Sequence, residues 1–376
     1  MSWSIRLFRV KGIEVKVHLT FVLILIWAAY YWSGSTGEGL QGALFGVAAT
    51  LLLFGSVTLH ELGHSMQALK YGVRVRDITL LPIGGIAQME EIPEDPRQEL
   101  GIAIAGPLVN FAIAAALIGI GALLQAQALI TVPELFRSLG AASWAGMLAY
   151  LTMANLAMGL FNLIPAFPMD GGRVLRALLA MRLDYPKATS IAVTVGQGLA
   201  LLLGLVGFMS SSFTLVLIAV FVWMGAGQEG KQVQIKTVLH GMKVGQAMTR
   251  QPQTLSAADS LVRAAELTLT TSQANFPVVE RDSGRLVGLL TESDLLKGLR
   301  AHGETVQVGQ VMHTSFPTAT PDEPIFQAQK QMAAGRVHAM PVVAADERPV
   351  GMLTAADINE AYRLLSVSPG LAPTHS

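Results

Sequence analysis

Six long apolar segments within the first 226 residues constrain the fold of this chain more than any other feature. A helix needs about 20 consecutive, mostly apolar residues to cross the hydrocarbon core of a bilayer. The first and last segments are short enough to be tilted or to cross only part of it. The segments are residues 18–32, 42–70, 100–124, 142–163, 188–209 and 213–225. Because the buried helices of a soluble core rarely give six such segments in so short a stretch, we expect a multi-pass α-helical membrane domain.

The composition changes sharply near residue 226. The whole chain is 52% hydrophobic and 14% charged, whereas an average soluble domain has roughly 25% charged residues. Long stretches before residue 226 carry almost no charge, and acids and bases alternate after it. This shift predicts a domain boundary, with a soluble part on its C-terminal side.

The charge balance and the absence of cysteine exclude some partners and some ligands. The net charge is zero and no dense stripe of Lys and Arg is present, so we expect no nucleic-acid partner. The chain has no cysteine, which removes disulfides and thiolate ligands. Any bound metal must therefore be held by His, Asp or Glu.

Basic residues are distributed unevenly among the connections between the apolar segments. The connections after the first, third and fifth segments contain a single basic residue, Arg137. The remaining basic residues of this part lie in the N-terminal arm, after the second and fourth segments, and after the sixth. They are Arg6, Arg9, Lys11, Lys16, Lys70, Arg74, Arg76, Arg97, Arg173, Arg176, Arg182, Lys187, Lys231 and Lys236. Under the positive-inside rule, both termini and the soluble part lie in the cytoplasm, and the protein resides in the cytoplasmic membrane.

The second apolar segment contains the motif HExxH, written here as HELGH at residues 60–64. On a helix, His60 and His64 project from one face and can bind one ion, and Glu61 is placed to take a proton from water. An ionisable residue inside a span costs about 2.5–3.5 kcal/mol, and such residues usually face a functional cavity. A metal site is therefore the favoured interpretation. The alternative is a hydrogen-bonded polar patch at the cytoplasmic end of a helix.

A third ligand is needed, because catalytic zinc usually takes three protein ligands and one water. Residues 161–173 begin at the end of the fourth apolar segment and contain one carboxylate, Asp170, after Pro165 and Pro168 and before two glycines. Such a helix break at membrane depth is tolerated mainly where it lines a cavity. Asp170 is thus the candidate ligand. Alternatively, it only caps a helix expected at residues 174–181.

These two motifs together resemble those of the site-2 protease family of intramembrane zinc metalloproteases. The second motif reads Asn-x-x-Pro-x-x-Pro-x-Asp-Gly-Gly-Arg, and the match covers the whole apolar part of the chain. The resemblance implies that His60, His64 and Asp170 bind one Zn²⁺ ion and that Glu61 is the catalytic acid and base. It also implies that Asn162 helps to stabilise the oxyanion. Alternatively, Asn162 satisfies the backbone of the broken helix.

A transmembrane helix must be unwound before one of its peptide bonds can be hydrolysed. Pairing of the unwound segment with a strand of the enzyme is one way to hold it open. Residues 73–89 begin with alternating valine and arginine, a pattern typical of a strand, and contain two adjacent glycines. This pattern predicts a hairpin. The family has a membrane-associated sheet in this region. We expect the edge formed by Gly84, Gly85, Ile86 and Ala87 to hold the substrate as an added strand. The alternative is a simple cytoplasmic hairpin.

Small residues in the third apolar segment indicate close helix packing. The sequence Ala-Gly-Pro-Leu-Val-Asn at residues 105–110 resembles another element of the family. Small residues let helices approach closely. We expect this packing role, with Asn110 near the site.

The soluble part contains an internal repeat. Residues 244–248 (Val-Gly-Gln-Ala-Met) recur as Val-Gly-Gln-Val-Met at 308–312, and a Pro-Val-Val sequence recurs at 277 and 341. A Gly-hydrophobic-hydrophobic-Thr sequence begins at 288 and again at 351. Each unit therefore predicts helix, strand, turn, strand and helix.

The repeat resembles a tandem pair of cystathionine-β-synthase (CBS) domains. Such pairs form one pseudo-symmetric module and commonly bind adenine nucleotides, here ATP or AMP. The resemblance assigns the phosphate and ribose contacts to Thr291, Asp294, Thr354 and Asp357. The alternative is that these residues only cap helices. CBS pairs often associate, which implies a homodimer, and His313 and His338 are expected to serve structure rather than metal binding.

Taken together, the sequence predicts a regulated intramembrane zinc metalloprotease. The fold class is a multi-pass α-helical membrane protein with a small membrane-associated β element and a cytoplasmic α/β tandem CBS module. Its substrate is a single-span membrane protein within the lipid bilayer. The alternative is a CBS-gated transporter in which the His/Asp cluster carries a metal ion. The expected boundaries are 1–226 for the protease domain, 227–239 for a linker, 240–301 and 302–366 for the CBS domains, and 367–376 for a flexible tail.

Overall fold

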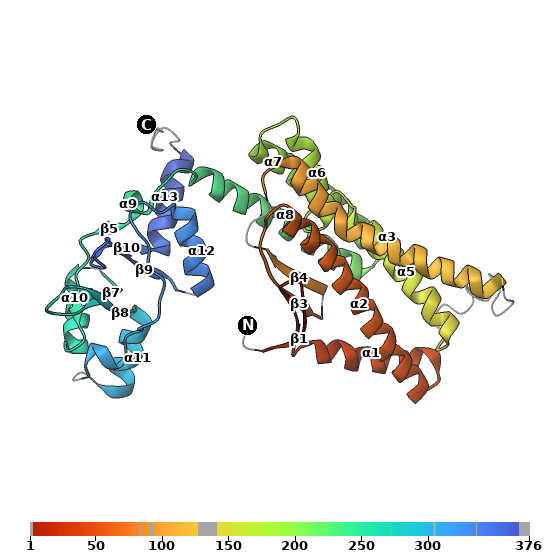
Figure 1. Cartoon of the computed structure of the whole chain (residues 1–376), viewed down its shortest axis with the longest axis horizontal. Coiled ribbons are helices and arrows are strands. Elements are labelled where there is room, and N and C mark those ends of the chain that lie inside the picture. The colour runs from red at the N-terminus through yellow and green to blue at the C-terminus, as the bar shows by residue number, and fades with distance from the viewer. Residues whose placement is uncertain are drawn as a thin grey trace. The chain divides into compact units, whose positions relative to one another are not determined.

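The computed structural model describes residues 3–82, 84–89, 93–126, 141–271, 273–303, 306–335 and 337–367. The chain divides into two compact units, Met1–Lys231 and Gln232–Ser376, which are described separately (Figure 1). The flexible tail expected at 367–376 lies, from residue 368 onwards, outside the described residues.

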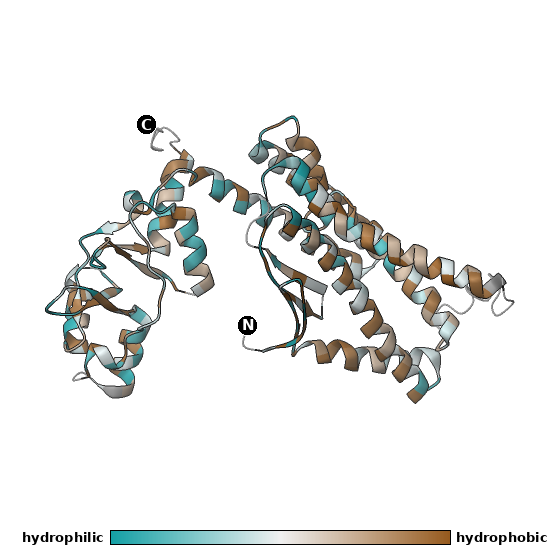
Figure 2. Cartoon of the chain, viewed as in Figure 1, coloured by the Kyte–Doolittle hydropathy of each residue, from teal (hydrophilic) through white to brown (hydrophobic). Residues whose placement is uncertain are grey.

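Within the described part of the first unit, each expected apolar segment forms one helix, and these helices are mostly apolar along their length (Figure 2). Five of them are long and apolar enough to cross a membrane; α1 has 16 residues and is shorter, about 24 Å. The last expected segment, residues 213–225, is the first half of a 26-residue helix. The helices are α1 (Phe21–Thr36), α2 (Leu40–Lys70), α3 (Pro96–Ala126), α5 (Trp144–Asn162), α7 (Tyr185–Met209) and α8 (Phe213–Val238).

A four-stranded sheet packs against this helical bundle. Its strands are β1 (Ser4–Val10), β2 (Ile13–His18), β3 (Val75–Leu81) and β4 (Gly84–Met89), in the order β1-β2-β3-β4. β3 and β4 form the hairpin expected from residues 73–89, and β2 pairs with β3 in parallel. The strands β1 and β2 were not anticipated, although the alternation of Ile13, Val15 and Val17 is typical of a strand.

One face of the sheet is buried against the membrane helices. Ile13 of β2 and Ile78 of β3 are fully buried and belong to one apolar cluster with Phe54 of α2 and Ile102 of α3. This packing fixes the position of the hairpin relative to α2. As a result, β4 lies at the edge of the sheet, beside the part of α2 that carries the HExxH motif.

The segment between α5 and the helix α6 (Asp170–Ala180) is wedged against α7 and α8. Phe167 is buried in a cluster with Ala192 of α7 and Ala226 of α8. A side chain at Gly225 would lie 2.7 Å from Pro168, so α8 and the proline-containing loop are in direct contact. The helix α6 begins four residues earlier than the helix expected at 174–181, so Asp170 lies in its first turn.

A buried ion-pair network holds α6 to two of its neighbours. Arg176 of α6 is 1% exposed and donates to Glu99 of α3 at 2.8 Å through its Nε. Its Nη1 donates to Glu229 of α8 at 2.7 Å. A buried guanidinium needs such partners to offset the loss of hydration. The network therefore fixes the axial position of α6.

The second unit consists of two repeats of similar structure. In the described residues, the order helix, strand, strand, helix expected for each repeat is confirmed. The first contains α10 (Leu261–Thr271), β7 (Phe276–Val279), β8 (Leu286–Leu290) and α11 (Glu292–His302). The second contains α12 (Ile325–Gly335), β9 (Ala339–Val343), β10 (Pro349–Thr354) and α13 (Ala355–Val367).

The opening segment of each repeat packs on the sheet of the other. The first repeat opens with α9 (Val244–Ala247) and β5 (Thr249–Arg250), and β5 pairs with β10 to give the sheet β5-β10-β9. The other sheet is β6-β7-β8, where β6 is Leu255–Ser256. The second repeat opens with a short 3-10 helix, Val308–Gln310, whose following residue Met312 packs on Gly288 of β8. Each folded half of the module therefore combines the strands and helices of one sequence repeat with the opening segment of the other.

Candidate metal centre

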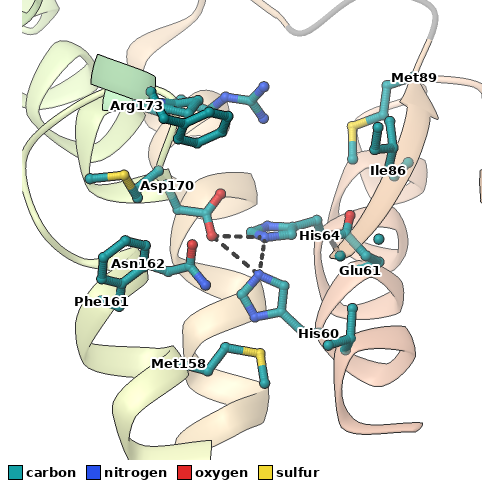
Figure 3. Close-up of a pocket in the computed structure, with 17 residues that line it drawn as sticks. His60, Glu61, His64, Ile86, Met89, Met158, Phe161, Asn162, Asp170 and Arg173 are labelled. Atoms are coloured by element: carbon teal, nitrogen blue, oxygen red, sulfur yellow. Dashed lines mark hydrogen bonds and ion pairs between the residues drawn. The ribbon is translucent and has the colours of Figure 1, made fainter. Parts of the chain in front are cut away.

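In the described part of the first unit, a cavity of about 700 Å³ brings together the nine site residues expected there (Figure 3). α2, β4, the end of α5, the start of α6 and α8 all contribute to its wall. The nine residues are His60, Glu61, His64, Gly84, Gly85, Ile86, Ala87, Asn162 and Asp170.

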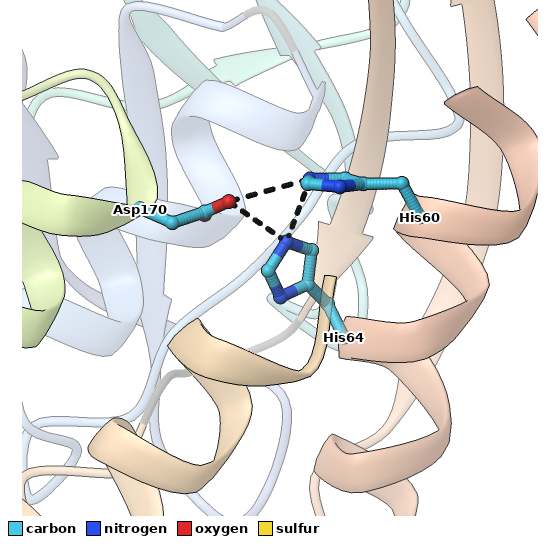
Figure 4. A group of neighbouring side chains, drawn as sticks. All are labelled: His60, His64 and Asp170. Atoms are coloured by element: carbon cyan, nitrogen blue, oxygen red, sulfur yellow. Dashed lines mark hydrogen bonds and ion pairs between the residues drawn. The ribbon is translucent and has the colours of Figure 1, made fainter. Parts of the chain in front are cut away.

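The two histidines and the aspartate converge on one point of this cavity (Figure 4). The Nε2 atoms of His60 and His64 are 3.1 Å apart, and Oδ2 of Asp170 lies 3.3 and 3.1 Å from them, respectively. All three residues are buried, with exposed fractions of 5%, 5% and 9%. His60 and His64 lie one helical turn apart on α2, as the motif predicts, whereas Asp170 comes from the first turn of α6.

The outer nitrogens of both imidazoles have acceptor partners. Nδ1 of His64 is 2.7 Å from the backbone oxygen of Ile102, which can only accept a hydrogen bond. Nδ1 of His60 is 2.5 Å from Oδ1 of Asn110. Each Nδ1 therefore carries the proton, and in the neutral ring the lone pair lies on Nε2. This is the tautomer that presents Nε2 as a metal ligand.

The arrangement fits a metal ion well. Ligand atoms about 2.0–2.1 Å from a tetrahedral zinc ion lie about 3.3 Å from one another, and the separations here are 3.1 to 3.3 Å. The cluster thus combines one carboxylate with two nitrogen lone pairs, a donor set that suits Zn²⁺.

Glu61 lies beside this cluster and is covered by β4. A side chain at Gly85 would come within 2.8 Å of Cγ of Glu61 and 3.1 Å of Val57. A side chain at Gly84 would meet nothing within 4 Å, whereas the strand approaches α2 closely at Gly85. Glycine at this position leaves room for the carboxylate between the strand and the helix.

Two further polar side chains reach the cavity from the other side. Asn162 is the last residue of α5, and its amide points toward the space next to Asp170 and His60 (Figure 3). Arg173 lies one turn after Asp170 on α6 and also lines the cavity. Arg173 was not among the residues predicted from the sequence, although its place at the end of the second motif is a signal that could have identified it.

The glycine of the Ala-Gly-Pro sequence in α3 has a definite packing role. A Cβ atom at Gly106 would overlap Nε2 of His64 and lie 2.8 Å from Cε1 of His60. A Cβ atom at Gly63 of α2 would likewise lie 2.9 Å from the backbone oxygen of Ala105 in the same interface. The expected close packing of helices is confirmed, and it allows α3 to lie directly against the imidazole rings.

In the second unit, the four residues expected to contact a nucleotide form two equivalent helix caps. Thr291 accepts a hydrogen bond from the backbone of Asp294 at 3.2 Å, and Thr354 accepts one from Asp357 at 3.1 Å. The capping role considered for these residues is therefore present. His313 contacts the first of these caps, because its Nε2 lies 3.0 Å from Oδ2 of Asp294.

Comparison with known proteins identifies a family for each of the two parts of the chain. The model of peptidase family M50 matches residues 48–205, and the CBS domain model matches residues 244–301 and 308–364. A zinc metalloprotease of Methanocaldococcus jannaschii is 40% identical over 77% of this chain and 78% of its own length. Rip3 of Mycobacterium tuberculosis is 31% identical over 98% of this chain and 96% of its own length.

Among solved structures, the site-2 protease from Methanocaldococcus jannaschii is 43% identical. The match covers 61% of this chain and 95% of that chain, with a TM-score of 0.43.

Replacement of Gly106 by alanine tests the geometry of the metal centre. The new methyl group overlaps the imidazole of His64, so we expect Gly106→Ala to weaken zinc binding about 10- to 100-fold. Gly119→Ala is the matched control, because Gly119 lies on the same helix with open space around it. The measurement is competition between the purified protein and a chromophoric chelator. Equal zinc affinity of the two variants would contradict the geometry.

Proposed function

Because this chain belongs to peptidase family M50, the site-2 proteases, and carries a tandem CBS module, we propose that it hydrolyses peptide bonds in or near the transmembrane segments of single-span membrane proteins. The observation that carries this proposal is the buried convergence of His60, His64 and Asp170 in a cavity among membrane helices. These three residues would hold the catalytic zinc ion. A cavity also lined by a strand edge is suited to an extended peptide.

The chain supplies the groups that hydrolysis needs. When bound, zinc supplies the Lewis acidity that activates water and the scissile carbonyl. Glu61 accepts the proton of the attacking water and returns it to the leaving amine as the C–N bond breaks. Asn162 donates its side-chain N–H to the oxygen on which negative charge develops. The cavity wall keeps these groups apart from bulk lipid and holds them on rigid helices.

Replacement of Glu61 by glutamine tests the protease function. The amide cannot take the proton, so cleavage should fall about 10²- to 10⁴-fold, whereas the three zinc ligands remain. The experiment follows a tagged single-span reporter co-expressed with each variant and measures zinc in the purified proteins. Glu38→Gln is the matched control, since Glu38 is exposed and lies outside the cavity.

The transporter alternative gives a different result in the same experiment. Reporters would stay whole with every variant, and vesicles containing the protein would take up zinc. Cleavage that persists in Glu61→Gln would refute the assigned role of this residue.

We propose further that the substrate binds as an added strand on β4. β4 is the last strand of the sheet, so among the described residues its outer edge has no pairing strand. Gly84, Gly85, Ile86 and Ala87 of this strand line the cavity, and Ile86 is 48% exposed. Pairing along this edge extends the peptide next to the zinc ligands, which exposes its carbonyl groups to attack.

Proline substitutions in β4 test this binding mode. Successive residues direct their N–H groups to opposite edges of a strand. One of Ile86→Pro and Ala87→Pro thus removes a donor from the outer edge without removing one that faces β3. That variant should lose reporter cleavage and still bind zinc, and Ile86→Ala should keep its activity. Full cleavage by both proline variants would rule out strand addition.

We propose that the CBS module binds an adenine nucleotide, ATP or AMP, on the cytoplasmic side and thereby regulates cleavage. The two half-sites are built alike: Thr291 contacts the carboxylate of Asp294, and Thr354 donates to that of Asp357 at 2.8 Å. These side chains are half-buried rather than sealed in the core. They are therefore available to a ligand.

The helix α8 offers a route from the module to the cavity. Phe221, in its first half, lines the cavity, and Val238, its last residue, packs on the core of the second repeat. One continuous helix therefore contains a residue of the active cavity and a residue of the CBS core. A shift of this helix changes the contact between Gly225 and Pro168, next to Asp170.

Sealed inside-out vesicles test both nucleotide control and orientation. ATP or AMP added outside should change the rate of reporter cleavage, because the module faces outward in these vesicles. Asp294→Ala and Asp357→Ala should each weaken the nucleotide response about tenfold, as expected for loss of a charged hydrogen-bond acceptor. Asp282→Ala, an exposed turn residue, is the control. A response only in right-side-out vesicles would reverse the orientation, and no response in either would refute nucleotide control.

A further inference from the structure

The two zinc-binding histidines are oriented in different ways. His64 donates to a backbone oxygen, that of Ile102, which cannot change its character. His60 instead faces the side-chain amide of Asn110. An amide can present either its oxygen or its NH₂ group, and only the oxygen accepts the proton of Nδ1. If Asn110 presented its NH₂ group, the proton of His60 would move to Nε2, and this nitrogen could no longer bind a metal.

The orientation of Asn110 is set by a second buried amide. Nδ2 of Asn110 donates to Oδ1 of Asn155 at 3.0 Å, and it also lies 3.6 Å from Sδ of Met158, which is a much weaker acceptor. Nδ2 of Asn155 donates to the backbone oxygen of Leu151 at 2.8 Å and to Oγ of Ser56 at 3.2 Å. Because the Leu151 oxygen can only accept, Nδ2 of Asn155 must face it, and Oδ1 is left to face Asn110. The direction of every hydrogen bond from Leu151 to His60 follows from this one acceptor.

The two amides of this network are buried among apolar helices, where polar side chains are rarely found without a structural or functional reason. Asn110 and Asn155 are both fully buried, on α3 and α5 respectively, among helices that face lipid. A polar group in such a place costs several kcal/mol if it is unpaired. Helix packing alone could use such a pair of amides. Packing does not, however, require the chain of donors to end on the outer nitrogen of a metal ligand.

We propose that Asn155 is a positioning residue for the zinc site, which rests on the proposed function of the cavity. It holds the Asn110 amide with its oxygen toward His60, and this fixes the tautomer in which Nε2 of His60 faces His64 and Asp170. Asn155 itself does not line the cavity. It acts on the metal through two hydrogen bonds, from a helix that carries no ligand.

The test compares zinc affinities of the purified full-length chain by chelator competition. Asn155→Leu removes the acceptor for Asn110 and should weaken zinc binding about 10- to 100-fold. Asn155→Asp keeps an oxygen toward Asn110 and should recover part of this loss. Thr152→Val is the control, because Thr152 lies on the same helix and bonds only to its own backbone, at Leu148. Visible absorption of the Co²⁺-loaded protein reports whether the ligand geometry changes with affinity.

A double variant separates positioning from packing. Asn110→Asp presents an acceptor oxygen to His60 in either orientation, so it no longer depends on Asn155. Asn155→Leu should therefore weaken zinc binding much less in the Asn110→Asp background than in the parent chain. An equal loss in both backgrounds would show a packing role only, and unchanged affinity of Asn155→Leu would overturn the proposal outright. Zinc binding that depends on Asn155, without any reporter cleavage, would refute the protease function alone.

Discussion

Burying two histidines and a carboxylate among apolar helices is the constraint on which the rest of this structure depends. Each polar atom in such a place needs a partner, and the partners come from elements far apart in the sequence. α2 supplies His60 and His64, whereas α6 supplies Asp170. Small residues then become necessary: α3 reaches the imidazoles only because residue 106 is glycine, and β4 passes over Glu61 only because residue 85 is glycine. The arrangement of helices follows from what the ligands require.

α6 illustrates how the bundle holds a ligand in place. Its first residue, Asp170, faces the two imidazoles, and Arg176 follows less than two turns later in a buried network with Glu99 and Glu229. The loop before the helix is packed between α7 and α8 through Phe167. The helix is thus fixed at its start, along its length and through the loop that leads into it. A ligand placed after a break in a helix gains in this way the rigidity that a metal centre needs.

The local parts of this architecture could be predicted from the sequence, and the long-range parts could not. Apolar length predicts the membrane helices, and the four-residue spacing of His60 and His64 places both on one face of α2. Asp170 was identified from the helix break around it and from the family resemblance, because no local pattern brings it to α2. Asn155 was missed entirely, since an asparagine in an apolar helix gives no sign of its partner on α3. β1 and β2 were missed although they form a local hairpin that turns at residues 11–12. The pairing of β2 with β3 joins segments more than 50 residues apart, which no local pattern indicates.

The exchange of opening segments between the CBS repeats has a consequence for how the protein is made. β5 pairs with β10, so Arg250 meets Gly351 about a hundred residues later in the chain. Synthesis runs from the N-terminus, and β5 therefore leaves the ribosome long before its partner exists. The membrane helices are inserted first, and the sheet of the second repeat closes only when the last strand has been translated. A newly made chain thus carries both histidines and the aspartate of the metal centre before it carries a closed CBS module.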